Sequence, residues 1–353
     1  MKLILINYSM SPKSLVFSHQ RETVLALAQH FKSIHVFTPE PFPESLPDNV
    51  KVSKLAWKRN SIFTNIFQIY KALLPTLIRN RDAIVFTHMT DVHAALISPL
   101  TWILRIRHVL WYAHAVNSVY LIWSSFFVSG IVSSTKGSCN LKVNKHKVTF
   151  INQGIKEHDF PYVQYDSSKL DKAFYYGRVD ASKNIHRIID LVEILNNRNC
   201  RISLDIYGKP ANSSSEDYLD DLKSKLDNYA LKLGVNFKGP IERSSVNQVT
   251  RGYGVFINLF TGSLDKTLIE VTFLGIPVIT WNQEYCSQFG TWSEQPVSSS
   301  LDFILEEFQS LEKLDLMVLN SKLSSRASKA IALHSFDGWV KRLVCILKDI
   351  ESL

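Results

Sequence analysis

The sequence predicts an α/β protein of two domains, each built on a parallel sheet. Its 353 residues allow about two domains. Apolar residues make up 46% and charged residues 20%, a balance that supports a large core without disulfide bridges. Short β-rich runs also alternate with helical runs of ten or more residues, and this alternation starts afresh halfway along the chain. Such alternation is typical of parallel βαβ units, so we expect two Rossmann-like domains.

The first series of elements covers about residues 1–165. Within it, residues 109–132 carry no formal charge, but polar residues are scattered along them. Because a membrane span needs about 20 predominantly apolar residues, we expect a buried strand, a loop and a short apolar segment here. The expected strands are Leu3–Asn7, His35–Thr38, Ala83–His88 and His108–Tyr112, and the expected helices are His19–Phe31 and Ser61–Arg79.

The second series covers about residues 166–335, after a linker expected at His158–Ser168. A last helix, Phe336–Ile350, opens the segment 336–353, which we expect to pack back toward the N-terminal domain. In two facing domains the ligand would bind in the cleft between them, at the carboxyl ends of the strands. The expected strands are Ala173–Tyr176, Ile202–Tyr207, Val235–Lys238, Val255–Leu259 and Ile276–Thr280, and the helices are Asn184–Asn196, Ser215–Leu233, Ser245–Arg251 and Lys266–Leu274.

The net charge of +8 is concentrated in the first half of the chain. Residues 1–170 carry a net charge of +10, and the remainder carries −2. A basic surface attracts anionic lipid headgroups or phosphates, although it can also serve solubility alone. The four cysteines lack metal-site spacing and fit a reducing compartment. We therefore expect a cytoplasmic protein, peripheral at the inner face of the membrane.

The segment Phe174–Asn184 has the features of a diphosphate site. A strand ends at Tyr176, and Gly177 allows a tight turn. Arg178 and Lys183 then lie near the start of the next helix, where two cations and the helix N–H groups favour an anion. The alternative is that both are solvated loop charges.

The segment from Phe260 to Thr280 has similar features. A strand ends in a polar loop, and a helix begins near Lys266, so the N–H groups of Thr267 and Leu268 would point toward an anion. Glu270 lies one turn further on, where its carboxylate could accept two vicinal hydroxyls of a ribose. The alternative is a Glu that complements the helix dipole.

In this order and separation, the motifs resemble the donor-binding half of the retaining GT-B glycosyltransferases of family 4 (glycosyl transferases group 1). The resemblance covers about residues 148–350 and predicts the GT-B fold. The matching residues are Gly177-Arg178 with Lys183-Asn184, Gly208-Lys209-Pro210, Phe237 with Gly239 and Ile241, and Glu270 with Gly275-Ile276-Pro277.

The resemblance implies a role for each of these residues. Arg178 and Lys183 would hold the donor diphosphate, beside Gly177, Gly208 and Lys209. Glu270 would bind the ribose and Ile241 would contact the base, while the N–H groups of Thr267 and Leu268 would face the phosphates. The co-substrate would be a UDP- or GDP-sugar, and the acceptor a glycan or a lipid-linked molecule. No D-x-D motif occurs, so neither a metal nor another cofactor is expected.

The chain departs from the family at one position of the donor motif. The first Glu of the family's paired block would stand at position 262, which is Gly262 here. The loop continues as Ser263-Leu264-Asp265-Lys266. We hypothesise that Asp265 takes over contacts to the donor sugar and that Lys266 supplies positive charge.

The first half offers fewer candidates. His114 follows the strand that ends near Tyr112, and in the family a His at this place lies near the donor sugar. His88 and Asp91 are weaker candidates on the acceptor side. The loop Ser9–Ser14 replaces the family's Gly-rich first loop and would face the acceptor.

The implied reaction transfers a sugar with retention at its anomeric carbon, as in polysaccharide or glycoconjugate synthesis. The residues Arg178, Lys183, Asp265 and His114 would be closest to the chemistry. Two alternatives on the same fold are a non-catalytic nucleotide-sugar-binding subunit and a sugar-nucleotide epimerase; a phosphorylase would need a longer chain. Nucleic-acid binding by the basic half lacks a recognisable reading module.

Overall fold

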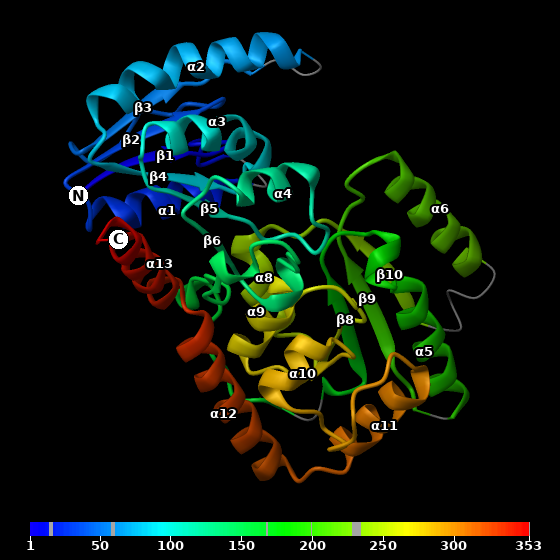
Figure 1. The fold of residues 1–353 in the computed structure, drawn as a ribbon. Helices are drawn as coiled ribbons and strands as arrows, with labels where there is room; N and C mark the ends of the chain where they lie inside the picture. Colours follow the sequence, from blue (N-terminus) through cyan, green and yellow to red (C-terminus); the bar gives the residue numbers. More distant parts are fainter. Residues whose placement is uncertain (14–16, 58–60, 167–168, 199, 228–233, 353) are drawn as a thin grey trace. The chain divides into compact units, whose positions relative to one another are not determined.

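The computed structural model describes residues 1–13, 17–57, 61–166, 169–198, 200–227 and 234–352 (Figure 1). The chain divides into two compact units. Unit 1 contains residues 1–154 and 337–353, and unit 2 contains residues 155–336. None of the described helices combines the length and apolarity that crossing a bilayer requires.

Within the described residues, unit 1 is built on a seven-stranded sheet in which all neighbouring strands pair in parallel, as predicted. The four strands expected from the sequence are present, while β3, β6 and β7 were missed. Both β3 and β7 are short edge strands with exposed residues, so their hydrophobic signal is weak. The order is β3-β2-β1-β4-β5-β6-β7, with bounds β1 Lys2–Ile6, β2 Ser33–Thr38, β3 Val50–Lys54, β4 Ala83–His88, β5 His108–Trp111, β6 Gly130–Ser133 and β7 Val148–Phe150.

Helices α2 and α3 pack side by side on one face of this sheet. The Tyr70 hydroxyl of α2 donates to the Leu96 carbonyl of α3 (2.9 Å), and Leu73 of α2 is buried in the same core cluster as Ile4 and Val85. The uncharged stretch 109–132 forms β5, α4 and β6. The helices of unit 1 are α1 Ser18–Ala28, α2 Ile62–Arg79, α3 Asp91–Ile103, α4 Val119–Ser125 and α13 Phe336–Ser352.

Helix α13 contributes its side chains to the core of unit 1. The Trp339 ring packs against Gly154 and lies 5.0 Å from the Trp111 ring, centroid to centroid. The Arg342 Nε donates to the Ile151 carbonyl (3.0 Å). The last turns of the chain therefore belong to the same compact unit as its beginning.

Unit 2 begins earlier than the boundary expected at residue 165. Ile155 forms a parallel bridge with Ser335, and its carbonyl accepts a hydrogen bond from the Phe336 N–H (2.7 Å). Phe160 is buried in the core of unit 2. The described part of the expected linker, residues 158–166, is thus tied to unit 2, and residues 167–168 lie outside the described residues.

The described part of unit 2 is built on a five-stranded sheet whose neighbouring strands all pair in parallel, again as predicted. Strand β12 is shorter than expected because only two residues pair with β11. The order is β10-β9-β8-β11-β12, with bounds β8 Lys172–Tyr176, β9 Ser203–Tyr207, β10 Val235–Gly239, β11 Val255–Ile257 and β12 Val278–Ile279.

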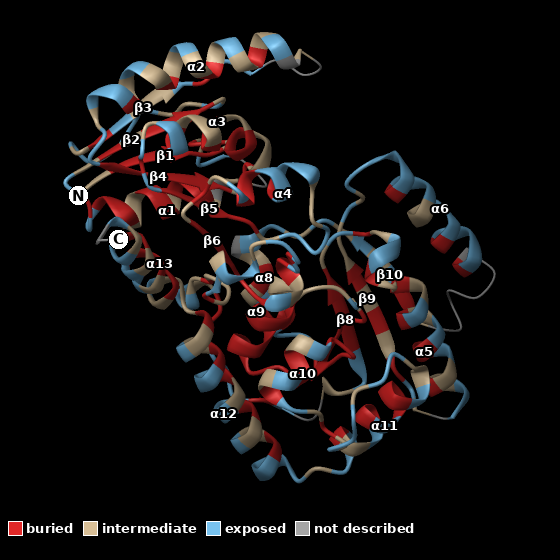
Figure 2. Ribbon diagram, in the orientation of Figure 1, coloured by how far each residue is buried: buried red, intermediate tan, exposed pale blue. Residues whose placement is uncertain are grey.

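The helices of unit 2 enclose a large apolar core (Figure 2). Helix α9 has the bounds predicted from the sequence, Lys266–Leu274, because Asp265 caps its first turn and Gly275 ends it. The expected extension of α6 from Asp227 to Leu233 lies outside the described residues. The other helices are α5 Ile185–Asn197, α6 Ser213–Asp227, α8 Val246–Thr250, α10 Gln283–Phe289, α11 Leu301–Glu312 and α12 Leu316–His334.

Candidate functional site

Three glycines bring the loops after β8, β9 and β10 into backbone contact. The Gly177 N–H donates to the Tyr207 carbonyl (3.0 Å), and the Gly208 N–H donates to the Gly239 carbonyl (2.9 Å). A Cβ added at Gly208 would lie 2.0 Å from the Gly177 carbonyl oxygen, a backbone atom that cannot yield. Glycine at position 208 is therefore a steric requirement, and it holds the loop that carries Arg178 against the loop that carries exposed Lys209.

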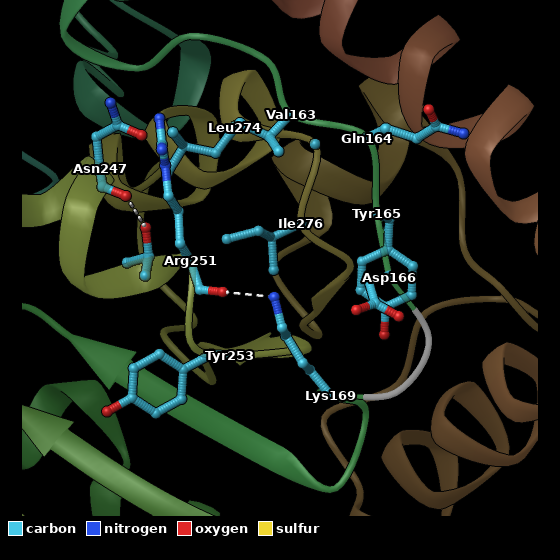
Figure 3. A pocket seen from close by; sticks show the side chains of 12 residues that line it. Val163, Gln164, Tyr165, Asp166, Lys169, Asn247, Arg251, Tyr253, Leu274 and Ile276 are labelled. Carbon is cyan, nitrogen blue, oxygen red and sulfur yellow. Dashed lines mark hydrogen bonds between the residues drawn. The ribbon is translucent and has the colours of Figure 1, made fainter.

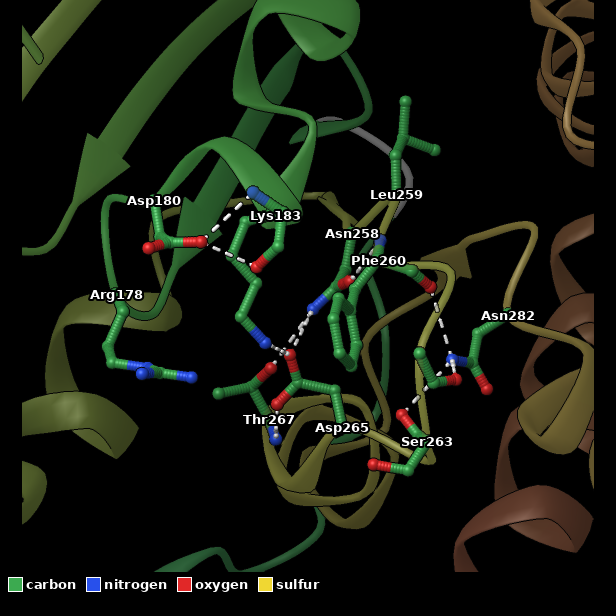
Figure 4. Close-up of polar contacts among 12 residues, drawn as sticks. Arg178, Asp180, Lys183, Asn258, Leu259, Phe260, Ser263, Asp265, Thr267 and Asn282 are labelled. Carbon is green, nitrogen blue, oxygen red and sulfur yellow. Dashed lines mark hydrogen bonds and ion pairs between the residues drawn. The ribbon is translucent and has the colours of Figure 1, made fainter. Parts of the chain in front are cut away.

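Lys183 and Asp265 form a buried ion pair that joins the two sequence motifs (Figure 4). Lys183 lies on the 3₁₀ turn Ala181–Lys183 and is 6% exposed. Its Nζ lies 2.5 Å from Asp265 Oδ2 and 3.7 Å from the centroid of the Phe260 ring. The ring covers the ammonium while the carboxylate neutralises it, so Lys183 does not present a free positive charge.

Asp265 has more than one partner. Its Oδ1 accepts the N–H of Thr267 (3.3 Å) and caps α9, while the Asn258 side-chain amide donates to Oδ2 (3.3 Å). Burial raises the pKa of this carboxyl group, but the Lys183 charge and the hydrogen bonds from Lys183, Asn258 and Thr267 outweigh burial and lower the pKa below its usual value. Asp265 is therefore ionised at neutral pH.

Arg178 differs from Lys183 in its surroundings. It is exposed at the carboxyl end of β8, and in Figure 4 its guanidinium end points toward the Lys183–Asp265 pair without a hydrogen bond or ion pair to it. Across the described residues we find no hydrogen bond or ion pair to its guanidinium. Arg178 thus offers to an incoming anion a positive charge that has no direct ion-pair partner, with the Asp180 carboxylate within electrostatic range.

Gly262, where the resembling family has a Glu, lies under the Phe260 ring. A Cβ at this position would come 2.1 Å from the Phe260 Cζ, so any side chain would displace the ring from Lys183. The Asn282 side-chain amide donates to the carbonyls of Phe260 and Gly262, both at 3.1 Å. The loop is therefore held in a conformation built around an aromatic ring, with no room for the family's carboxylate.

Glu270 is buried and finds its partners within the protein. Its Oε2 accepts a short hydrogen bond from the Tyr176 hydroxyl, and its Oε1 lies 2.8 Å from Arg243 Nη2 as an ion pair. Burial raises the pKa of Tyr176, and the Glu270 charge raises it further. A ligand is thus not needed to explain the burial of this carboxylate, contrary to the argument made from the sequence. Its role toward a ribose stays a prediction.

Arg243 is the residue of this region that sequence reasoning missed. Its side chain is 47% exposed, so it can reach both Glu270 and a bound molecule. It follows half-buried Ile241, the residue expected to contact the base, by two positions. The sequence signal that could have identified Arg243 is its position just after the Phe237–Ile241 turn.

The start of α9 is already engaged in hydrogen bonds. The Thr267 N–H donates to the Asp265 side chain, and the Leu268 N–H donates to the Asp265 carbonyl (3.2 Å). Half-buried Lys266 begins the same turn. These N–H groups would have to exchange the Asp265 oxygens for phosphate oxygens, so their predicted role depends on a rearrangement of Asp265.

The candidates in unit 1 lie at the carboxyl ends of its strands. His114 is exposed after β5, with its ring edge-on to Tyr112 at 5.3 Å. The Asp91 carboxylate caps its own helix turn and accepts the Ser118 hydroxyl (2.5 Å). Ser9 is buried and pairs with Glu40, while Ser14, the end of the predicted acceptor loop, lies outside the described residues.

Several buried polar atoms gather where β1 and β4 end. Neither ring nitrogen of His93 has a hydrogen-bond partner in the described part of the chain, and the ring lies between Trp57 (4.6 Å) and Tyr8 (5.9 Å). Burial lowers the pKa of His93 to about 4, so the ring is neutral at pH 7. Three other buried polar atoms without a hydrogen-bond partner in the described residues lie close to this place in the sequence or in the register of the sheet: Asn7 Oδ1, His88 Nδ1 and Thr90 Oγ1. Buried polar groups without partners are uncommon, which marks this edge as a second candidate site.

One pocket of unit 2 lies apart from the Arg178, Lys183 and Asp265 loops (Figure 3). It is formed by residues that precede β8, β11 and β12, at the amino ends of these strands. Lys169 Nζ donates to the Arg251 carbonyl (3.0 Å) within it, beside Tyr165 and Tyr253. Gly275 and Ile276 of the matching motif line this pocket, but none of the residues expected to bind the donor does, so it is not the site that the sequence predicts.

Comparison with known proteins finds the fold but no sequence family. No family model matches the chain, and no curated protein matches it. HepE from Anabaena in complex with UDP is similar with a TM-score of 0.75 and 12% identity, over 99% of this chain and 100% of HepE. Sucrose-phosphate synthase from Thermosynechococcus elongatus has a TM-score of 0.72 and 14% identity, over 100% and 99%. OtsA without ligand has a TM-score of 0.75 and 10% identity, over 99% of each chain.

This chain has the GT-B fold. The expectation of two Rossmann-like domains with parallel sheets is thereby confirmed. At identities of 14% and below, the likeness concerns the fold, and the activity of the GT-B chain has to be argued from its own residues.

Proposed function

We propose that this GT-B protein is a glycosyltransferase that moves a sugar from a nucleotide-sugar donor to a glycan or lipid-linked acceptor. The observation that carries the proposal is the juxtaposition of Arg178, Lys183 and Asp265 at the carboxyl ends of β8 and β11. Ligands of open α/β sheets bind at this edge. The neighbour HepE has been solved with UDP and with UDP-glucose, which supports a uridine nucleotide as the donor.

In this proposal Arg178 attracts and holds the donor diphosphate. Its guanidinium is exposed and has no direct ion-pair partner among the described residues, whereas the Lys183 charge is already balanced by Asp265. Lys183 then acts as a hydrogen-bond donor positioned by Asp265 and Phe260. As the sugar leaves, negative charge grows on the diphosphate, and these fixed donors stabilise it electrostatically without a metal ion.

The nucleoside would lie further along the same edge of the sheet. Glu270, held by Tyr176 and flanked by Arg243, would accept the ribose hydroxyls, and Ile241 would contact the base. The close packing of Gly177 and Gly208 brings the Lys209 loop to the same place. We place the donor sugar near Asp265 and Lys266, which is why the departure at Gly262 bears on which sugar is used.

The acceptor side belongs to unit 1 in this proposal. His114 would contact the donor sugar, and the edge formed by His88, Asp91 and His93 would bind the acceptor hydroxyls. The neutral His93 ring and its aromatic neighbours suit a sugar ring, which is apolar on its faces and polar at its rim. We further propose retention at the anomeric carbon, membership of family 4, and a cytoplasmic enzyme of polysaccharide or glycoconjugate synthesis.

The test is a thermal-shift screen of the purified protein against UDP-, GDP-, ADP- and dTDP-sugars. A donor at a hundred times its dissociation constant stabilises the fold by ~2.7 kcal/mol. We expect a shift with one nucleotide class that Arg178→Ala removes. The matched control is Arg201→Ala, an exposed arginine at the amino end of β9, which should keep the shift. If no nucleotide sugar shifts the wild-type protein, the proposal fails.

A non-catalytic nucleotide-sugar-binding subunit is the second candidate. The observations that favour it are the missing carboxylate at Gly262 and the neutralised Lys183. Such a subunit would show the donor-induced shift but would release no nucleoside diphosphate, with or without acceptor.

A further inference from the structure

Helix α2 carries large apolar side chains on its solvent side. Its inward stripe, Ile69, Leu73 and Leu77, is fully buried against the sheet. The opposite stripe would be polar on an ordinary surface helix. It instead contains Phe63 (85% exposed), Phe67 (64% exposed), Lys71, Pro75 and Ile78 (50% exposed). Figure 2 shows this outer side of α2 as exposed.

Helices α3 and α4 continue this exposed apolar surface. Trp102 and Ile103 at the end of α3, and Trp123 and Phe126 at the end of α4, are each between 51% and 68% exposed. The Phe127 ring joins them, at 6.0 Å from the Trp102 ring and 5.0 Å from the Trp123 ring. We define the α2–α4 surface as Phe63, Phe67, Ile78, Trp102, Ile103, Trp123 and Phe126.

The segment of the chain that carries the α2–α4 surface is mostly positively charged. Residues 49–156 contain fourteen Lys and Arg residues but two carboxylates, Asp82 and Asp91. Asp82 lies 3.1 Å from Lys2 Nζ as an ion pair, and Asp91 accepts the Ser118 hydroxyl. Lys147 Nζ donates to the Ser125 and Val128 carbonyls, both at 2.9 Å, which places its charge at the end of α4.

We propose that the α2–α4 surface docks onto an anionic lipid bilayer. Exposed aromatic and aliphatic side chains gain free energy by entering the headgroup region, and surrounding cations are attracted to lipid phosphates. A nucleic acid would engage the cations but would leave Phe63 and Phe67 in water. The docking stands without the proposed transferase activity; its further consequence, access to a lipid-linked acceptor, rests on that proposed function.

The test is co-sedimentation of the full chain with vesicles. Vesicles of phosphatidylcholine alone are compared with vesicles that also contain phosphatidylglycerol, at low and high salt. We expect binding to the anionic vesicles alone, weakened by salt. Lys142 and Lys145 are exposed beside Asn144, whose side-chain amide donates to the Ser125 hydroxyl (3.1 Å) at the end of α4. Lys142→Gln/Lys145→Gln should weaken binding about twenty-fivefold, at about fivefold per lysine near the surface. Phe63→Ser/Phe67→Ser should weaken it by about tenfold through lost apolar burial.

The matched controls lie in unit 2. Met317→Ser/Val318→Ser removes two exposed apolar side chains from the start of α12, and Lys223→Gln/Lys225→Gln removes two exposed lysines from α6. Both should bind vesicles like the wild type. Equal binding to neutral vesicles, or unchanged binding by both α2–α4 variants, would overturn the proposal. The absence of vesicle binding would also overturn it. In that case, a dimer in sedimentation velocity that Phe63→Ser/Phe67→Ser dissociates would assign the surface to a second copy of this chain. Thermal unfolding of the same variants without ligand reports on their folding. The additional shift with the donor nucleotide sugar reports on the proposed function, separately from vesicle binding.

Discussion

The Lys183 ammonium and the Asp265 carboxylate lie 2.5 Å apart and are both largely buried. They come from the two loops that the sequence assigns to donor binding, 82 residues apart in the chain. Because each neutralises the other, the positive charge that remains for a diphosphate is carried by Arg178. Asp265 therefore sets the state of Lys183, caps α9, and occupies the N–H groups that a phosphate would need.

The effects of Lys183 and Asp265 substitutions on the free energy of unfolding should be strongly coupled. Removing one partner leaves a buried charge without compensation, so Lys183→Met and Asp265→Asn should each cost about 3 kcal/mol or more. The double variant should cost less than the two losses added together, since no charge is left unpaired. Urea unfolding measures all three. As a control, Glu294→Gln at the exposed Lys322–Glu294 pair should change stability by less than about 0.5 kcal/mol. Additive costs would show that the pair does not act as a unit.

The glycine at position 208 should be required by packing against the backbone. Gly208→Ala places a Cβ 2.0 Å from the Gly177 carbonyl oxygen, so we expect a loss of about 3 kcal/mol. Gly252→Ala is the matched control, because its Cβ would meet no atom closer than 3.6 Å. Thermal unfolding of both variants decides the matter, and an unaffected Gly208→Ala would mean that the strand ends can separate.

The Phe260 ring should occupy the space that a side chain at position 262 would need. Gly262→Ala should cost about 1–2 kcal/mol in the wild-type background, since the ring must leave Lys183. In a Phe260→Ala background the same substitution should cost close to nothing. Chemical denaturation of the four proteins measures the difference, and an equal cost in both backgrounds would count against this account of the loop.

His93 should make the protein sensitive to mild acid. Its pKa is about 4 in the folded protein and about 6.5 when unfolded, so the unfolded state binds the proton first as pH falls. The stability it contributes is complete above pH 6.5 and is lost progressively down to pH 4, by up to about 3 kcal/mol. His93→Phe should flatten this part of the stability curve. An unchanged pH dependence would show that the ring is accessible to protons in the folded state.

Much of the fold could be predicted because it depends on local patterns. The strands β1, β4, β5 and β8 are apolar runs, β2, β9 and β10 alternate apolar with polar residues, and parallel pairing follows from the helices between them. Helix α3 was missed because it contains Pro99 and is apolar on most of its surface, which hides the helical period. The short edge strand β3 was missed although its alternation of Val with Lys and Ser is the pattern of a half-buried strand.

The candidate site could be predicted only as a set of loops. Sequence spacing brings Arg178 and Lys183 to the end of one strand and Asp265 to the start of one helix. It does not reveal that Lys183 and Asp265 touch, that Phe260 fills the space at Gly262, or that Arg243 reaches Glu270. These contacts join separate elements of the fold, and no local pattern specifies them.

The most direct test of the central claim is the release of nucleoside diphosphate from the nucleotide sugar that binds in the thermal-shift screen. It is measured by a coupled assay for the wild type and Asp265→Ala, with and without acceptor extracts. We expect turnover by the wild type and a loss of at least about a hundredfold in Asp265→Ala, because Lys183 loses the partner that positions it. Full turnover by Asp265→Ala would contradict the assignment of this site.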